Sequence, residues 1–166
     1  MKRKLITIFM MIIICILLQG CNKNTEDGKI EVFLAIRAED NEKLLFSDED
    51  IQEYIWETHE IKFNEEFLSK VGDLSSAYVS SNSTMSHEGG SKLLGTLSMD
   101  RFIFTVNGER IYDGYFEPVL TSSNIPMGVI ISDITDGVKL KLTSPDEDPR
   151  ANQELYNVLK EKDLLQ

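Results

Sequence analysis

The sequence predicts an α+β fold, with a mostly antiparallel sheet that contains two hairpins and two or three short helices packed on one face. Two stretches of alternating apolar residues are each interrupted by a turn that contains glycine. Elsewhere, apolar residues at helical spacing follow good capping residues. Because about 138 residues suffice for one hydrophobic core, residues 29–166 are expected to form a single domain.

The first hairpin has the clearest local pattern in the chain. Residues 101–106 and 109–116 are rich in aromatic and β-branched side chains and flank the pair Asn107-Gly108. Both central residues of a type I′ turn need a positive φ, which Asn and Gly tolerate. These residues therefore predict two strands joined by a two-residue turn.

Three further strand regions follow from the same reasoning. Residues 129–134 and 138–142 flank Asp136-Gly137, which predicts a second hairpin with its turn at this pair. Apolar residues alternate at period two in residues 30–37 and again in residues 59–63. Each of these two runs predicts a strand.

Helices are expected at three places, after a polar turn at residues 38–43. Ser47 to Asp50 resembles a helix N-cap with acidic residues in the first turn, and residues 51–56 could continue that helix or be extended. Asn64 is a good N-cap for a helix that ends at Gly72. A closing helix is predicted over residues 151–162 from its apolar face.

Regular patterns are absent between residues 73 and 98. Seven of the seventeen residues from Ser75 to Ser91 are serine, and two glycines follow near the end of this stretch. Such a composition predicts a long, mobile loop rather than a strand or helix.

The first 21 residues have the pattern of an export signal. Lys2, Arg3 and Lys4 precede an apolar run from Leu5 to Leu18, which is broken only by Thr7. This run of fourteen residues is shorter than the ~20 that a membrane-spanning helix needs. A basic start followed by a short apolar region is typical of a secretory signal.

The end of this segment, Leu18-Gln19-Gly20-Cys21, resembles the lipobox of bacterial lipoproteins. The resemblance implies that residues 1–20 are removed and that Cys21 receives lipid, with residues 21–28 as a polar tether. It implies a domain on the extracytoplasmic face of the cell membrane, with the lipid bilayer as its first partner. Two alternatives stay open: an uncleaved membrane anchor, and a signal with a generic cleavage site.

Charge and cysteine content exclude several function classes. The first 20 residues hold three basic residues and no acidic one, so residues 21–166 carry 14 basic against 28 acidic side chains, a net charge of −14. Nucleic acid is therefore an unsuitable partner, because no basic stripe can neutralise phosphates. The two cysteines are Cys15 in the signal and Cys21, so the domain itself is expected to use neither disulfides nor thiol chemistry.

Parts of the chain resemble the first extracytoplasmic domain of the SecD and SecF protein-export subunits. The resemblance lies in residues 61–68, 107–112, 128–131 and 152–165, which form strand, hairpin and helix elements rather than a catalytic motif. It implies an α+β fold. It does not imply an export-motor role, because the transmembrane helices of those subunits have no counterpart here. Small bacterial lipoproteins with a lone domain of this type are the nearer comparison.

A search for catalytic residues predicts none. His59 lies in a predicted strand and is expected to be a core or sheet-surface residue, whereas His87 lies in the serine-rich loop. Ser86, Ser91 or Ser122 could complete a triad with a histidine and an acid, but none lies in a nucleophile elbow.

Metal and cofactor sites are likewise not predicted. The acidic run Asp146-Glu147-Asp148 lacks the spacing and glycine of an EF-hand and is interpreted as a solvated turn. Gly89-Gly90-Ser91-Lys92 does not meet the spacing of a phosphate-binding loop.

Aromatic residues give the one candidate binding surface. Consecutive residues of a strand point to opposite faces, so Tyr115 and Phe116 cannot both face the core from one side. Trp56, Tyr112 and Tyr115, together with Ser122 in the loop at 121–124, could form a recognition surface for a peptide or another envelope component. The alternative is that the aromatic residues pack beneath the closing helix.

These observations favour a lipid-anchored, non-enzymatic domain that binds or assists a membrane or envelope protein. Two other functions remain open. One is a small envelope hydrolase whose catalytic residues are dispersed along the sequence. The other is a sensor that binds a ligand or ion through residues 75–91.

Overall fold

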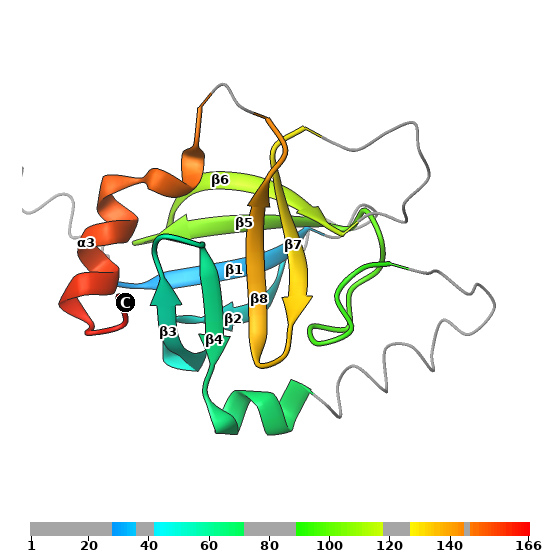
Figure 1. Cartoon of the computed structure of the whole chain (residues 1–166), viewed down its shortest axis with the longest axis horizontal. Coiled ribbons are helices and arrows are strands. Elements are labelled where there is room, and N and C mark those ends of the chain that lie inside the picture. Colours follow the sequence, from blue (N-terminus) through cyan, green and yellow to red (C-terminus); the bar gives the residue numbers. More distant parts are fainter. Residues whose placement is uncertain (1–27, 36–41, 72–88, 118–126, 145–146) are drawn as a thin grey trace, which may run out of the picture.

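The computed structural model describes residues 28–35, 42–71, 89–117, 127–144 and 147–166, and it confirms the predicted α+β class (Figure 1). Its eight strands form one sheet in the order β2-β1-β5-β6-β7-β8-β4-β3. All neighbouring strands are antiparallel except the parallel pair β6 and β7. The strands are β1 (Ile30–Ala35), β2 (Glu42–Ser47), β3 (Ile51–Ile55), β4 (Glu60–Phe63), β5 (Arg101–Val106), β6 (Glu109–Phe116), β7 (Val129–Ile134) and β8 (Gly137–Leu142).

The sheet is strongly bent and forms two halves. In Figure 1, β1, β5 and β6 run across the view, whereas β3, β4, β7 and β8 run upright. The direction changes where β6 pairs with β7. The two outermost strands, β2 and β3, are consecutive in sequence and are joined by the short 3₁₀ helix η1 (Asp48–Asp50). The two ends of the sheet therefore meet at this corner.

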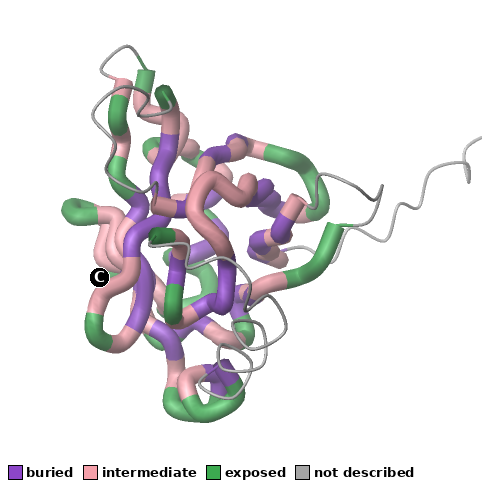
Figure 2. Tube along the Cα trace, turned by 90° about the vertical axis from the view of Figure 1, so that its right-hand side faces the viewer, coloured by how far each residue is buried: buried purple, intermediate pink, exposed green. Residues whose placement is uncertain are grey.

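The bent sheet encloses one hydrophobic core. Two helices contribute to it: one at residues 65–71 and the other, α3 (Gln153–Glu161), near the C-terminus. Figure 2 shows the buried segments mainly in the middle of the domain and the exposed segments mainly at its periphery. Because both helices share one core with the sheet, they lie on its inner face, as predicted. The largest fully buried aromatic side chains are those of Tyr54, Phe46, Phe63, Phe102, Phe104 and Phe116.

The first predicted hairpin is confirmed in detail. Asn107 and Gly108 have φ values of 52° and 75°, so both residues have the left-handed conformation that a type I′ turn requires. The Asn107 side chain also accepts hydrogen bonds from the backbone N–H groups of Gly28 (2.7 Å) and Lys29 (3.1 Å), and it donates one to Glu154 (2.8 Å). The turn thus holds the start of β1 against α3.

The second hairpin is also present, but its predicted turn is wrong by one residue. Residues 135 and 136 form the turn, and Gly137 is the first residue of β8, paired with Ile134. A Cβ atom at Gly137 would lie 1.8 Å from the carbonyl oxygen of Ile61. Glycine is needed here because β4 approaches closely, rather than because the turn requires it.

One helix boundary differs from the predictions, and the structure decides between the two conformations left open for residues 51–56; the predicted helix end at Gly72 lies outside the described residues. η1 forms after Ser47, whose backbone N–H donates to the Asp50 carboxylate (2.8 Å), but residues 51–55 are extended as β3. The closing helix does not begin at Ala151, because residues 149–151 form the separate 3₁₀ helix η2 (Pro149–Ala151). Asn152 is the N-cap of α3 and accepts hydrogen bonds from the N–H groups of Glu154 and Leu155.

Strand β2 was not predicted, and its first residues replace part of the expected turn at residues 38–43. Only Phe46 of this strand is buried, so its sequence shows no clear alternation. Both β2 and β3 also have irregular pairing with their neighbours, at Val32/Phe33 and at Ile51/Glu53. A register shift moves side chains out of the period-two pattern on which the prediction depends.

The described end of the predicted loop at 73–98 contains turns but no strand or helix. The Asp133 carboxylate accepts hydrogen bonds from the Ser91 hydroxyl and from the N–H groups of Lys92 (2.7 Å) and Leu93 (3.4 Å). Ser91 and Leu94 are buried. Residues 89–98 are therefore held against β7.

Candidate functional site

A polar cluster lies beside the turn between β3 and β4. The turn spans residues 56–59, and His59 has a φ of 51°, in the left-handed region. The prediction that His59 lies within a strand is therefore wrong, because β4 begins one residue later. The turn directs the His59 ring toward the interior, where its side chain is 12% exposed.

Four polar side chains form a chain of contacts in this cluster. The Tyr54 hydroxyl lies 2.9 Å from Nδ1 of His59, and Nε2 of His59 lies 3.8 Å from the Asp148 carboxylate. Arg150 donates to that carboxylate through Nε (2.7 Å) and Nη2 (2.6 Å). Its Nη1 donates to the carbonyl oxygen of Leu140 (2.6 Å). The cluster thereby joins β3, η2 and β8.

Burial and charge shift the pKa values of these groups in different directions. Burial raises the pKa of Tyr54 well above its usual value. Burial, followed by the positive charge of Arg150, lowers the pKa of His59, and Asp148 opposes this only in part. Hydrogen bonds from Arg150 lower the pKa of Asp148. At neutral pH the cluster is thus a neutral tyrosine, a neutral histidine and an arginine–aspartate ion pair.

The proposed aromatic surface is not a single surface. Tyr112 is 6% exposed, and its buried hydroxyl has no hydrogen-bond partner among the described residues, so Tyr112 is a core residue and its assignment to a binding surface is wrong. Trp56 packs against Tyr156 of α3, with ring centroids 5.0 Å apart. The Tyr115 ring lies beneath Arg101 instead, with 5.8 Å between the ring centroid and the guanidinium carbon. Ser122 and Cys21 lie outside the described residues.

The aromatic residues therefore belong to different environments for a simple geometric reason. Tyr112 and Tyr115 are three residues apart on one strand, so their side chains point to opposite faces of the sheet. Tyr112 stacks on Phe104 in the core, at 4.8 Å between ring centroids. The sequence left two interpretations open for the aromatic residues, a recognition surface and packing within the domain. Tyr112 and Trp56 follow the second, because both pack against other aromatic side chains of the domain.

The polar cluster gives limited access to a substrate. Tyr54 is completely buried. A pocket of about 250 Å³ opens beside Asp148, but its other lining residues are Ile111, Glu147, Pro149, Ala151 and Asn152. Within the described ranges, no hydrogen bond joins His59 to a serine, and Ser91 bonds to Asp133 instead. His87 and Asp146 lie outside those ranges.

The residues that the structure describes offer no cluster of metal ligands. Asp148 of the acidic run is engaged by Arg150, and no group of three or more potential metal ligands occurs among the residues described. The same part of the chain contains no helix of the length and apolar character needed to cross a membrane.

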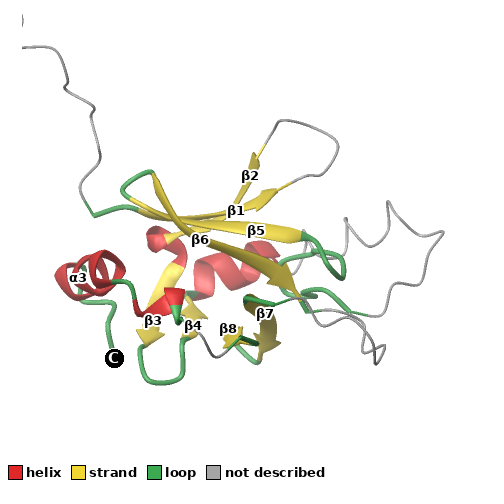
Figure 3. Ribbon diagram, turned by 90° about the horizontal axis from the view of Figure 1, so that it is seen from above, coloured by secondary structure: helices red, strands yellow, loops and turns green. Residues whose placement is uncertain are grey.

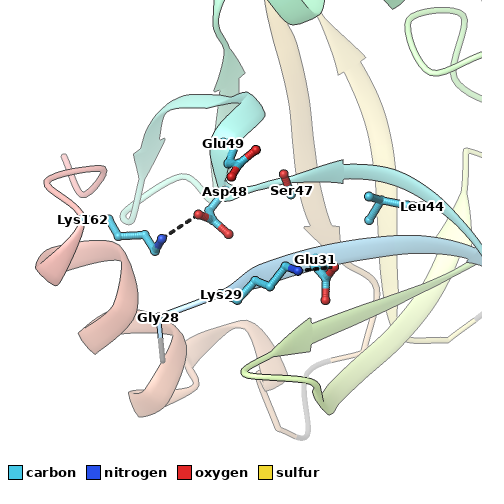
Figure 4. Close-up of a pocket in the computed structure, with 8 residues that line it drawn as sticks. All are labelled: Gly28, Lys29, Glu31, Leu44, Ser47, Asp48, Glu49 and Lys162. Atoms are coloured by element: carbon cyan, nitrogen blue, oxygen red, sulfur yellow. Dashed lines mark hydrogen bonds and ion pairs between the residues drawn. The ribbon is translucent and has the colours of Figure 1, made fainter. Parts of the chain in front are cut away.

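A second, larger pocket lies at the corner where the two sheet ends meet. Its volume is about 400 Å³, and Figure 4 shows side chains from β1, β2, η1 and the end of α3 around it. The lining residues are Gly28, Lys29, Glu31, Leu44, Ser47, Asp48, Glu49 and Lys162. This pocket is beside the first described residue, Gly28.

Asp48 connects three elements at this pocket. Its buried carboxylate accepts hydrogen bonds from the Ile30 backbone N–H (2.8 Å) and from Lys162 Nζ (2.7 Å). Lys29 and Glu31 form a second ion pair at 3.3 Å. The pocket therefore has a charged lining built from residues that are distant in the sequence.

The two outer strands of the sheet differ in how they are covered. Beside β3, the C-terminal residues run parallel to the strand: Tyr54 N–H donates to Leu164 O (2.7 Å), Gln166 N–H to Tyr54 O (3.0 Å) and Trp56 N–H to Gln166 O (3.1 Å). Strand β2 pairs with β1 on one side, and no described residue pairs with its other side. Figure 3 shows β2 at the margin of the molecule.

Sequence reasoning missed the pocket and the open strand. The sequence predicts a helix start at the acidic residues after Ser47, but the partner of Asp48 is Lys162, 114 residues later. No local pattern signals a contact at that separation. Exposed Leu44 gives no signal either, because single surface leucines are common.

Comparison with known proteins gives no further identification. No protein-family model, no curated protein and no solved structure matches the chain.

Proposed function

We propose that this chain is a lipid-anchored domain on the extracytoplasmic face of the cell membrane, and that it acts by binding an envelope or membrane protein rather than by catalysis. The observation that carries the binding function is the open edge of β2, next to a pocket of about 400 Å³. An unpaired edge offers backbone donors and acceptors to another chain. The lipobox-like segment supports the anchor.

The arrangement of the polar cluster favours a structural role over a catalytic one. A nucleophile or general base must be within reach of a substrate. Tyr54 is fully buried, and burial favours its protonated form. The His59 ring and the Asp148 carboxylate are held by other members of the cluster.

Similarity to the SecD and SecF domain, and a sensor role for residues 75–91, stay predictions from the sequence.

The anchor is tested by replacing the proposed lipidated residue. Cys21→Ala is expected to abolish incorporation of labelled palmitate, and either to release the domain from the membrane fraction or to leave an uncut precursor. Cys15→Ala is the matched control, because it removes the other cysteine and should leave labelling unchanged. Labelling and membrane recovery of Cys21→Ala equal to wild type would contradict the proposed anchor.

The binding function is tested by photocrosslinking in intact cells. A photoreactive phenylalanine at position 44 on β2 is expected to give a specific crosslinked product at native abundance. The control is the same amino acid at position 52, an exposed residue on the covered strand β3. Absence of a product at position 44, or equal products at both positions, would argue against binding at β2.

A further inference from the structure

We propose that the outer edge of β2 and the adjoining pocket bind an extended peptide segment that carries basic side chains, as an added antiparallel or parallel strand. This inference rests on the proposed binding function and names the class of partner. Strand addition uses backbone hydrogen bonds for affinity, while pockets for alternate side chains provide specificity. Both components occur together at this corner of the domain.

The first component is the outer edge of β2, which is one of the two edges of the sheet. The chain covers the β3 edge with residues 164–166, through three backbone hydrogen bonds. No such cover exists for β2 among the described residues. Edge strands that avoid pairing commonly carry charged residues. In β2 the charges are confined to Glu42 and Lys43, and the residues nearer the pocket are uncharged.

The second component is the position of the pocket relative to that edge. Leu44 and Ser47, both on β2, belong to its lining, and Leu44 is 47% exposed. A strand added beside β2 would lie about 4.8 Å away, with alternate side chains next to those of β2 on the same face. A long side chain of the added strand, next to Leu44 or Ser47 on this face, would therefore reach the part of the pocket that these two residues line. Figure 4 shows Leu44, Ser47 and Asp48 in line along β2 and the start of η1.

The charges of the pocket select the type of side chain. Three carboxylates, those of Glu31, Asp48 and Glu49, face two lysines. Both lysines already contact a carboxylate: Lys29 pairs with Glu31 and Lys162 with Asp48. Among the described residues, no ion pair involves the exposed Glu49 carboxylate. A lysine or arginine side chain of the peptide would be attracted to this excess negative charge, and an acidic one would be repelled.

The net charge of the whole chain supports the same partner. Residues 21–166 carry a formal charge of −14. A second copy of the chain would bring the same charge to the edge, whereas a basic peptide would be attracted from a distance. Binding is therefore expected to weaken as salt is added.

The test uses the full chain with its own N-terminal residues, in dodecyl maltoside. The probe is a fluorescein-labelled seven-residue peptide of alternating valine and lysine, and its control has glutamate in place of lysine. Fluorescence anisotropy is expected to show saturable binding of the lysine peptide and at least about tenfold weaker binding of the glutamate peptide. Hydrogen exchange of the β2 amides should slow only with the lysine peptide.

Backbone pairing is tested separately with N-methylated peptides. Methyl groups on one alternate set of amides remove the donors that face β2, whereas methylation of the other set removes donors that face solvent. One of the two peptides is expected to lose binding at least about tenfold, and the other to bind nearly as well as the parent. Equal effects of both would overturn the strand-addition geometry.

The pocket is tested with two charge-reversing variants. Glu49→Lys is expected to weaken binding of the lysine peptide about tenfold, because it reverses the unpaired charge. Glu57→Lys makes the same charge change in the exposed turn between β3 and β4 and should alter affinity less than twofold. Equal weakening by both variants would show a general charge effect and overturn a role for the pocket.

Other results would overturn this inference without touching the broader proposal. Concentration-dependent dimers that protect the β2 amides would assign the edge to a second copy. Protection of β2 that disappears when residues 22–27 are deleted would assign it to the chain's own preceding segment. A crosslinked partner at position 44 together with no binding of the lysine peptide would leave the proposed binding function intact. Loss of both would contradict both proposals.

Discussion

The two edge strands of the same sheet have opposite surroundings. On the β3 side, residues 164–166 pair with the strand. In the same region Trp56 packs on Tyr156, and the Tyr54 hydroxyl contacts His59. On the β2 side, no described residue pairs with the outer edge of the strand, which lies next to a charged pocket. Residues 164–166 thus cover one edge of the sheet, whereas the other edge has no pairing partner among the described residues and is the proposed binding site.

The comparison predicts the largest loss of stability on the covered side. Deletion of residues 164–166 removes four backbone hydrogen bonds, three of them to Tyr54 and Trp56, and exposes the N–H of buried Tyr54. We expect the free energy of unfolding to fall by about 4 kcal/mol in urea denaturation, since each such bond contributes about 1 kcal/mol and two leucines lose packing. Gln166→Ala keeps the backbone and should cost less than about 0.5 kcal/mol. A deletion as harmless as Gln166→Ala would show that the C-terminal pairing contributes little.

A smaller loss is expected at the corner beside the open edge. Asp48→Ala leaves the buried Ile30 N–H without its acceptor and should lower the free energy of unfolding by about 2–3 kcal/mol. Asp48→Asn retains an acceptor for that N–H, and Lys162→Met removes only the cation. Each of these controls should cost less than Asp48→Ala, since neither leaves the Ile30 N–H without an acceptor. Equal losses for Asp48→Ala and Lys162→Met would assign the stabilisation to the ion pair instead.

The polar cluster on the covered side is expected to respond to pH. Burial lowers the pKa of His59 in the folded state below its ordinary value of about 6.5. As the pH falls below 6.5, the unfolded chain binds a proton that the folded chain does not, so stability should decrease until the pH reaches the folded pKa. Thermal denaturation between pH 7.5 and 5.0 measures this slope. The lowered pKa of Asp148 affects stability only at more acidic pH, below its ordinary value.

His59→Asn is the control for this pH dependence. Asparagine does not titrate and tolerates the positive φ at position 59. The variant should be less stable at pH 7.5 because it loses the contact with Tyr54, but its melting temperature should change less between pH 7.5 and 5.0. An unchanged slope would mean that other groups cause the dependence.

The smallest effect is expected at the open edge itself. Leu44 is 47% exposed and contributes little to the core, so Leu44→Thr should change the free energy of unfolding by less than about 0.5 kcal/mol. Chemical denaturation measures this directly. A loss above about 1 kcal/mol would show that β2 is covered in the free protein, and it would remove the contrast between the two edges.

Much of the local structure could be predicted, and the reason is visible at Asn107-Gly108. The φ preferences of two adjacent residues are enough to define that turn. At Asp136-Gly137 the same reasoning failed, because Gly137 is required by the approach of Ile61 from another strand. Glycine alone does not reveal which of these constraints applies. The candidate aromatic surface failed similarly, because alternation places Tyr112 and Tyr115 on opposite faces without showing which face is covered.

The sequence by itself determined the α+β class, the first hairpin and the capped start of the helix after Asn64, since these depend on side-chain periodicity and on φ preferences of neighbouring residues. It also carries the predicted lipid-anchor signal. Only the tertiary structure decided which strands form the edges, that residues 164–166 cover one of them, and that Asp48 meets Lys162 beside the other. Those features depend on strand order and on contacts across more than a hundred residues, which no local pattern specifies.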